Sequence, residues 1–218
     1  IINTGTGSNV VVKLVGKSSY ISFTGDSLIG NTTSTSTSSN MSVVRNYQKG
    51  CEYITLKNNV LLGSAYSIYT YGDRTVANYN KGWTIENNKI LEFRYCGLYM
   101  YYHTGSEINW NEVVNKKAQY GYYGFLVQYS YLTNINYNKI HMDVTGYAYG
   151  LYSQYCRATS SDRKSISNNM IAITGGNGTH YGGRFYYNDY CDIDFNSISI
   201  ERGNAFPVYL YYGNGVNF

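Results

Sequence analysis

One line of sequence recurs six times along this chain of 218 residues, and it limits the possible folds more than any other feature. Each copy carries an asparagine with an aliphatic residue three positions before it and another two positions after it. The asparagines, 23 to 31 residues apart, are Asn59, Asn88, Asn111, Asn138, Asn169 and Asn196. Internal repeats of this length indicate stacked structural units, each of which buries its apolar side against its neighbours.

A second line recurs between the copies of the first. It reads SIYTYG from Ser67, GLYMYY from Gly97, GFLVQY from Gly124, GLYSQY from Gly150, GGRFYY from Gly182 and PVYLYY from Pro207. Its copies lie 25 to 32 residues apart, with a mean of 28. Two patterns that keep step in this way predict coils of about 28 residues, and the chain has room for about seven of them.

The residues within these lines favour strands over helices. Apolar and polar side chains alternate, β-branched and aromatic residues are frequent, and Gly, Asn, Asp and Ser separate the segments. A helical repeat would instead need apolar residues at a spacing of about 3.6. Short strands and turns in every coil predict an all-β parallel β-helix. The asparagines have a physical role in such a fold, because stacked amides hydrogen-bond along the axis.

These residues carry a resemblance to a known family. The Ile-x-x-Asn-x-Ile lines over roughly residues 51–218 resemble the repeats of right-handed parallel β-helix proteins. The opening segment, residues 10–30, is similar to the first coils of secreted β-helix proteins and large surface adhesins of Bacteroidota. The resemblance implies a right-handed β-helix that forms an extracellular module of a bacterial cell-surface protein. It selects no activity, because lyases, hydrolases, tailspikes and adhesins share this fold.

The whole chain, residues 1–218, is predicted to form a single β-helix domain. Residues 30–42 (GNTTSTSTSSNMS) are polar and low in complexity, which predicts a loop excursion from a coil. Neither end carries a polar segment that would cap the last coil, so we expect a piece of a larger protein. Open coil ends also allow further coils or modules to stack end to end.

The second line predicts which side chains face outward. Because side chains of a strand alternate between two faces, the inward set should run from Ile68 and Leu98 to Val208 and Leu210. The outward residues of successive coils would then form tyrosine ladders along one sheet. The residues predicted to bind a ligand, by stacking or hydrogen bonding, are Tyr69, Tyr71, Tyr99, Tyr101, Tyr152, Arg184, Tyr186, Tyr209 and Tyr211.

Such a surface has two interpretations. Stacked tyrosines can simply stabilise a parallel sheet, each cross-strand pair by about 0.2–1 kcal/mol. An exposed strip of tyrosine with arginine and glutamine at its edges also suits a glycan, whose sugar rings have apolar faces and polar rims. It would equally suit another macromolecule, since Tyr and Arg are favoured contact residues.

Composition excludes two classes of partner. Charged residues make up 14% of the chain and the net charge is +4, without the basic patch that nucleic-acid binding requires. Apolar runs such as VVV at residues 10–12 are far too short for insertion into a membrane. The four irregularly spaced cysteines form disulfides or stay buried as thiols: Cys51, Cys96, Cys156 and Cys191.

A polysaccharide lyase or glycoside hydrolase fragment is the enzymatic alternative. Such enzymes need two or more carboxylates in one cleft, or acids beside a base. The densest acidic segment is NDYCDID, residues 188–194, a candidate calcium or substrate site beside Arg184 and His180. Acids elsewhere do not share register in adjacent coils, and His103 and His141 are expected at the surface. No catalytic residue, metal site or cofactor is therefore predicted.

The preferred hypothesis is a non-catalytic, extracellular β-helix module that presents a tyrosine-rich face to a glycan or another macromolecule. A third possibility is purely structural, in which the coils build a stalk or fibre and the tyrosines serve only the sheet.

Overall fold

The computed structural model describes residues 10–33, 36–47, 50–116 and 122–218. It is a parallel β-solenoid of about six turns, with about 27 residues between successive turns. Among the described residues, the only helical element is the short 3₁₀ turn η1 (Val76–Asn78). The predicted all-β parallel β-helix is therefore confirmed. None of the described segments forms a helix with the length and apolar character needed to cross a lipid bilayer.

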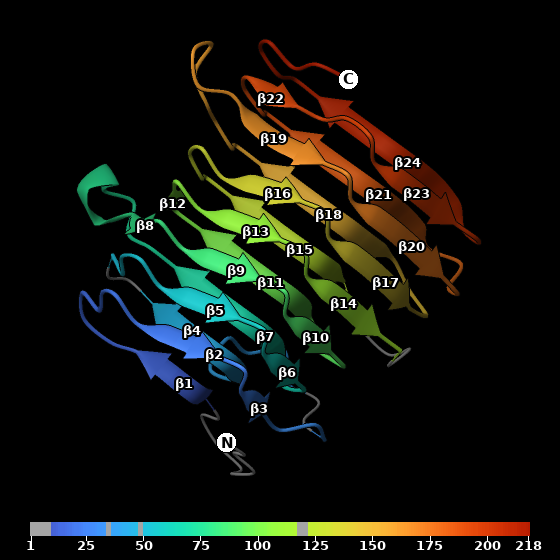
Figure 1. Ribbon diagram of the computed structural model, residues 1–218. Coiled ribbons are helices and arrows are strands. Elements are labelled where there is room, and N and C mark those ends of the chain that lie inside the picture. The colour runs from blue at the N-terminus through green and yellow to red at the C-terminus, as the bar shows by residue number, and fades with distance from the viewer. Residues whose placement is uncertain (1–9, 34–35, 48–49, 117–121) are drawn as a thin grey trace.

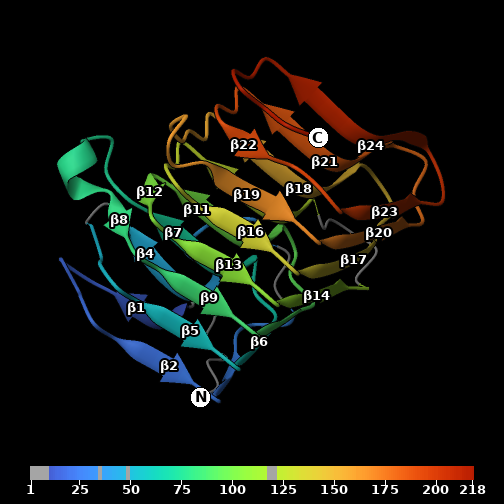
Figure 2. The same cartoon turned by 45° about the horizontal axis from the view of Figure 1, so that its top comes forward.

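Three large parallel sheets run along the solenoid, and successive coils add neighbouring strands to each of them (Figure 1, Figure 2). Sheet I contains, in order, β1 (Val10–Leu14), β4 (Ser42–Tyr47), β7 (Tyr66–Tyr71), β11 (Cys96–Tyr101), β15 (Tyr123–Gln128), β18 (Ala148–Gln154), β21 (Thr179–Tyr186) and β24 (Asn204–Tyr211). Sheet II contains β3 (Ser27–Ile29), β6 (Val60–Leu62), β10 (Lys89–Leu91), β14 (Glu112–Asn115), β17 (Lys139–Asp143), β20 (Met170–Thr174) and β23 (Ser197–Ile200). Sheet III contains β2 (Ser22–Thr24), β5 (Thr55–Lys57), β9 (Thr84–Glu86), β13 (Glu107–Asn109), β16 (Asn134–Asn136), β19 (Lys164–Ser167) and β22 (Cys191–Asp192). A two-stranded sheet joins β8 (Asn80–Lys81) to β12 (His103–Thr104).

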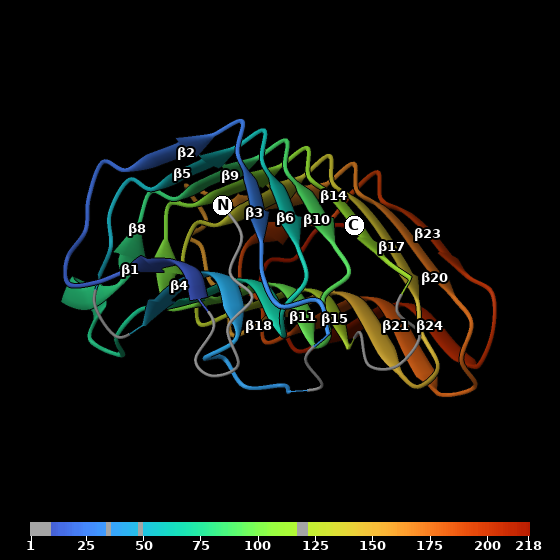
Figure 3. The same cartoon turned by 90° about the horizontal axis from the view of Figure 1, so that it is seen from below.

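The apolar core fills the space that the three sheets enclose. In Figure 3, sheets III and II meet along one corner and sheet I lies opposite that corner. Ile68 and Leu98 of sheet I, Ile90 of sheet II and Ile85 of sheet III all point into this space and are fully buried. Burial of each such side chain contributes about 1.5–3 kcal/mol, so every added coil extends a continuous core.

Two residues of the last strand differ from the predicted pattern. Val208 and Leu210 were expected to point into the core, but they are 47% and 40% exposed. Both lie on β24, which within the described ranges pairs only with β21 and forms the edge of sheet I. The alternation itself holds, because Leu210 lies opposite the buried Phe185 in the strand register, but the described residues place no further coil over this strand.

The asparagine ladder predicted from the first repeat line is present at the corner between sheets III and II. The side-chain Nδ2 of Asn88 donates to Oδ1 of Asn111 at 3.0 Å and to the carbonyl oxygen of Leu56 at 2.8 Å. The backbone N–H of Asn88 donates to the same Oδ1 at 3.0 Å. The side-chain step repeats at 2.9–3.0 Å through the ladder Asn59, Asn88, Asn111, Asn138, Asn169 and Asn196.

A residue in the left-handed conformation precedes each asparagine of the ladder. Its φ angle lies between +51° and +59° at Asn58, Asn87, Trp110, Tyr137, Asn168 and Phe195. Asparagine tolerates this conformation, whereas an aromatic residue pays about 1–2 kcal/mol for it. The cost recurs because this conformation turns the chain from sheet III into sheet II in every coil.

A polar network lies inside the core beside sheet I and corrects the expectation for one histidine. His103 was expected at the surface, but it is fully buried. Its Nε2 lies 2.8 Å from Oγ1 of Thr70 and 2.9 Å from Nδ2 of Asn80. Burial lowers the pKa of this imidazole to about 3, so it is neutral. Of the two alternatives for the cysteines the structure favours buried thiols, because all four are unpaired and buried.

Candidate functional site

We define the tyrosine face as the outward side chains of sheet I, which form three rows along the solenoid. Row one is Lys13, Arg45, Tyr69, Tyr99, Leu126, Tyr152, Arg184 and Tyr209. Row two is Tyr47, Tyr71, Tyr101, Gln128, Gln154, Tyr186 and Tyr211. Row three is Tyr66, Cys96, Tyr123, Tyr149, Tyr181 and Phe206. All nine residues predicted to bind a ligand lie together in rows one and two.

Rings of successive coils stack face to face within these rows. The centroids of Tyr69 and Tyr99 are 4.8 Å apart with 7° between the ring planes. Tyr71 and Tyr101 stack at 4.7 Å and 5°. Each ring therefore covers the face of its neighbour. The surface that such rows offer consists of ring edges and phenol hydroxyl groups rather than open aromatic faces.

Some side chains of the tyrosine face are more buried than the exposed strip predicted from the sequence. Tyr69 and Tyr152 are only 8% and 9% exposed, and they join a second apolar cluster outside the main core. Met41, at the end of the polar segment 30–42, belongs to the same cluster. Burial raises the pKa of Tyr69 and of the half-buried Tyr99 above the usual value for a phenol. These rings contribute packing to sheet I in addition to any contact they make.

The residues of row three were not among those predicted to bind a ligand. A glycine interrupts the inward–outward alternation of side chains from which that prediction was made. A Cβ atom on Gly124 would lie 2.7 Å from Cγ2 of Ile140, so the missing side chain faces the core. The next residue, Phe125, also points inward and is fully buried. Two consecutive inward positions turn the preceding Tyr123 outward. The same contact with sheet II recurs at Gly97, Gly124, Gly150 and Gly182.

Row three borders an open cleft of about 370 Å³. Tyr149 and Tyr181 stack along its floor with centroids 5.0 Å apart and 2° between their planes. Tyr147, from the turn before β18, is 47% exposed at its rim. The residues that line the cleft are Tyr123, Tyr147, Tyr149, Gly178, Thr179 and Tyr181.

Arg184 lies beside this cleft and is surrounded by tyrosine side chains. In row one it replaces a ring between Tyr152 and Tyr209, and its Cζ lies 4.8 Å and 5.6 Å from their centroids. Further rings lie 5.2–5.8 Å away, those of Tyr149, Tyr181 and Tyr186. Stacking of this kind engages the flat faces of the guanidinium group and leaves its N–H edge for hydrogen bonding.

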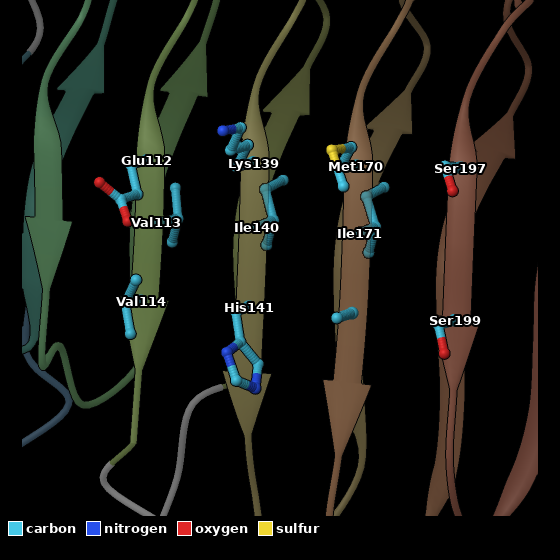
Figure 4. Close-up of a pocket in the computed structure, with 11 residues that line it drawn as sticks. Glu112, Val113, Val114, Lys139, Ile140, His141, Met170, Ile171, Ser197 and Ser199 are labelled. Atoms are coloured by element: carbon cyan, nitrogen blue, oxygen red, sulfur yellow. The ribbon is translucent and has the colours of Figure 1, made fainter.

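A hollow on the outer side of sheet II was not predicted. It has a volume of about 310 Å³ and crosses β14, β17, β20 and β23. Figure 4 shows Glu112, Lys139 and His141 among the side chains on its open side. Val113 and Ile140 alternate with them and are buried in the core. Glu112 lies opposite Lys139 in the strand register and 4.0 Å from Nζ of Lys89, so charges of both signs are mixed here.

An exposed aromatic pair stands at the corner next to this hollow. Trp110 and Tyr137 stack with centroids 4.2 Å apart and 4° between their planes, and they are 54% and 43% exposed. The sequence signal was an aromatic residue directly before the ladder asparagine, in the segments NWN and NYN. The left-handed conformation at that position directs the side chain away from the core. This pair is an aromatic surface outside sheet I, as is the stacked and exposed pair Tyr20 and Tyr53.

The acidic segment 188–194 does not assemble as the candidate calcium site. Asp192 accepts from Nη2 of Arg163 at 2.7 Å, and this hydrogen bond lowers the pKa of the carboxyl group. Asp189 pairs with Arg157 at 3.7 Å. Arg184 lies on β21 in sheet I, whereas Asp192 lies on β22 in sheet III. Across the described ranges, no three His, Cys, Asp or Glu side chains are grouped so that they could hold a metal ion.

No protein-family model matches the chain, and no curated protein matches it either. The solenoid and its surfaces are therefore the features from which a function can be inferred.

Proposed function

We propose that this solenoid is a non-catalytic binding module of an extracellular, cell-surface protein, and that it holds a glycan on the tyrosine face. The observation that carries the proposal is the open cleft beside row three, where tyrosines from three successive coils converge next to Arg184. Clefts that combine aromatic walls with a few hydrogen-bonding groups are the usual form of a small-ligand site.

The geometry of the rows favours hydrogen bonding to sugar hydroxyls over stacking on aromatic faces. Tyr149 and Tyr181 cover each other's ring faces, and both side chains line the open cleft. A phenol hydroxyl both donates and accepts a hydrogen bond, as does a sugar hydroxyl. Successive strands place these groups about 4.8 Å apart, so a chain of sugars that runs along the axis meets the same group repeatedly.

A variant that keeps the rings and removes only the hydroxyls tests this proposal. Binding of the wild type and of Tyr149→Phe/Tyr181→Phe would be measured on a glycan array and then by calorimetry. We expect about a tenfold loss of affinity, the equivalent of one or two lost hydrogen bonds. Circular dichroism should be unchanged, because stacking and burial are preserved.

The matched control is Trp110→Ala/Tyr137→Ala, which removes the exposed aromatic pair on the other side of the molecule. This variant should bind as the wild type does. Loss of glycan binding by this control variant alone would indicate that the glycan binds at the hollow of sheet II instead. Absence of binding by every protein would favour the structural alternative, in which the tyrosines serve only the sheet of a stalk.

The lyase or hydrolase alternative has a separate test. It would require release of reducing or unsaturated sugars that depends on Asp192 or Asp194. The pairing of Asp192 with Arg163 in the described residues gives this alternative less support, because an engaged carboxylate is poorly placed to act as a base.

A further inference from the structure

The charged residues of sheet I are all of one sign. Its eight strands contain no Asp or Glu. Three cations lie on the outer side, Lys13, Arg45 and Arg184, and all three belong to row one. The tyrosine face is therefore a cationic and aromatic surface without a compensating carboxylate in its strands.

Arg184 is held in place but has no anionic partner. Its guanidinium lies 4.8–5.8 Å from five tyrosine centroids, and Nη1 approaches only the hydroxyl of Tyr149, at 3.5 Å. Its Nε is buried and has no hydrogen-bond partner among the residues that the structure describes. None of the ion pairs within the described ranges involves this residue. The charge of this guanidinium is therefore not compensated by a carboxylate within the described ranges, and an incoming anion would compensate it.

Arg45 repeats the arrangement at the other end of row one. Its Cζ lies 5.3 Å from the centroid of Tyr47 and 6.0 Å from that of Tyr69, and its Nε is also buried, with no partner in the described part of the chain. Lys13 is its neighbour in the strand register. Five strand steps separate Arg45 from Arg184, roughly 24 Å at about 4.8 Å per step. The two cations thus mark the ends of one straight track along the axis.

We propose that the ligand of the tyrosine face is an anionic polysaccharide, whose carboxylate or sulfate groups pair with Arg184 and, further along the same chain, with Arg45. This inference rests on the proposed function and names the class of glycan. A guanidinium group matches a carboxylate or sulfate in a two-point contact, because its N–H donors lie in one plane. The tyrosine hydroxyls between the two cations would contact the neutral hydroxyls of the intervening sugars.

The stacked rows argue against a single-stranded nucleic acid as the anion. Proteins that bind such strands place bases on open aromatic faces. Here the faces of Tyr69, Tyr99, Tyr149 and Tyr181 are covered by neighbouring rings at 4.8–5.0 Å. A polysaccharide needs only the edges and hydroxyls, which remain available.

The test compares one polymer with and without its charge. Alginate, a polyuronate, and alginate with its carboxyl groups methyl-esterified would be titrated against the wild-type protein by calorimetry. Heparin would represent the sulfated source and poly(dT) the nucleic-acid alternative. We expect binding of alginate or heparin that weakens with added salt, and at least a tenfold weaker response to the ester.

Arg184→Gln should reduce affinity for the charged polymer by about tenfold to a hundredfold, as expected for one lost charge-assisted contact. Lys139→Gln is the matched control, because it removes the same charge from the hollow of sheet II and should leave affinity unchanged. Arg45→Gln provides a second position if the Arg184 variant folds poorly. Its effect should appear with long polymers and disappear with oligosaccharides too short to span the track.

The outcomes separate this inference from the proposed function. Equal binding of alginate and its methyl ester, insensitive to salt, would overturn the anionic ligand and leave glycan binding in place. Tighter binding of poly(dT) than of both anionic polysaccharides would overturn it in favour of nucleic acid. Equal affinity of the Arg184→Gln, Arg45→Gln and wild-type proteins would remove these cations from the site. No binding of any of the four polymers, together with an empty glycan array, would overturn both proposals.

Discussion

Asn88 and Asn111 are 23 residues apart in sequence, yet the amide of one lies directly against the amide of the other. Two donors of Asn88, the backbone N–H and the side-chain Nδ2, share Oδ1 of Asn111, each at 3.0 Å. Asn111 in turn donates to Oδ1 of Asn138 at 3.0 Å and to the carbonyl oxygen of Ile85 at 2.8 Å. One side chain thus satisfies buried groups in the coils on both sides of its own, which explains why the sequence repeats asparagine at this corner.

Replacement of Asn111 by alanine should therefore be strongly destabilising. The change removes the acceptor of the buried backbone N–H of Asn88 and of one of the two side-chain N–H groups of Asn88, and each unsatisfied buried group costs about 1–3 kcal/mol. We expect the free energy of unfolding to fall by about 2–4 kcal/mol in urea titrations. Glu112→Ala, at the next and exposed position, is the control and should change stability by less than about 0.5 kcal/mol. Equal midpoints for the two variants would contradict a structural role for the ladder.

Gly124→Ala should also destabilise the solenoid, and for a different reason. The new methyl group would lie 2.5 Å from the carbonyl oxygen of Gly150 and 2.7 Å from Cγ2 of Ile140, in a fully packed region. Overpacking of this kind costs about 1–3 kcal/mol. Gly146→Ala is the matched control, because a Cβ there meets nothing within 4 Å and its φ is not positive. Thermal unfolding should show a lowered midpoint for the first variant only.

The repeats made the fold predictable because their spacing equals the number of residues in one coil. Asn88 and Asn111 mark the same corner of successive coils, and Tyr99 and Leu126 mark the same outward position. Both positions could be inferred from the repeat alone, without knowledge of any interatomic distance. The irregular position could not be predicted in the same way. Strict alternation does not reveal that Gly124 and Phe125 both face inward, since this depends on the contact of that glycine with Ile140 in another sheet.

The candidate site was predictable in outline and incomplete in detail. The nine predicted residues do share one face, since register follows from the repeat. Sequence alone could not show that Tyr69 is 8% exposed while Tyr147 is 47% exposed, because the turns between sheets II and I decide this. It also missed Trp110, whose exposure follows from its left-handed backbone conformation. Burial of His103 depends on the packing of Thr70 and Asn80 around the ring.

His103 should make stability fall as the solution becomes more acidic. Burial lowers the pKa of the folded imidazole from 6.5 to about 3. Between these values the unfolded chain binds a proton that the folded chain excludes, so stability decreases as pH falls through this window. The slope is about 1.4 kcal/mol per pH unit for one group.

Urea unfolding between pH 4 and pH 7 would check this for the wild type and for His103→Asn, which copies the Asn80 that occupies the same register position in the preceding coil. The variant should have a shallower dependence on pH. His180, whose pKa burial also lowers, remains in both proteins and accounts for a residual slope. Parallel curves for the two proteins would mean that His103 takes up its proton in the folded state.

The packed tyrosines should limit stability at the alkaline end. Burial raises the pKa of Tyr66, Tyr99 and Tyr123 above the usual value of 10, most of all through loss of hydration. Above that value the unfolded chain releases protons that the folded chain retains, so the free energy of unfolding decreases as pH rises. Tyrosinate absorbance should therefore account for fewer than the 28 tyrosines until the circular dichroism signal is lost, and the remainder should ionise in that same step.

The chain in concentrated urea is the control, because all 28 tyrosines should then titrate together. Tyr66→Phe should reduce the late step by one group and leave the early step unchanged. Complete ionisation near pH 10 with the fold intact would show that the tyrosine face is open to water, contrary to the packing of rows one and three.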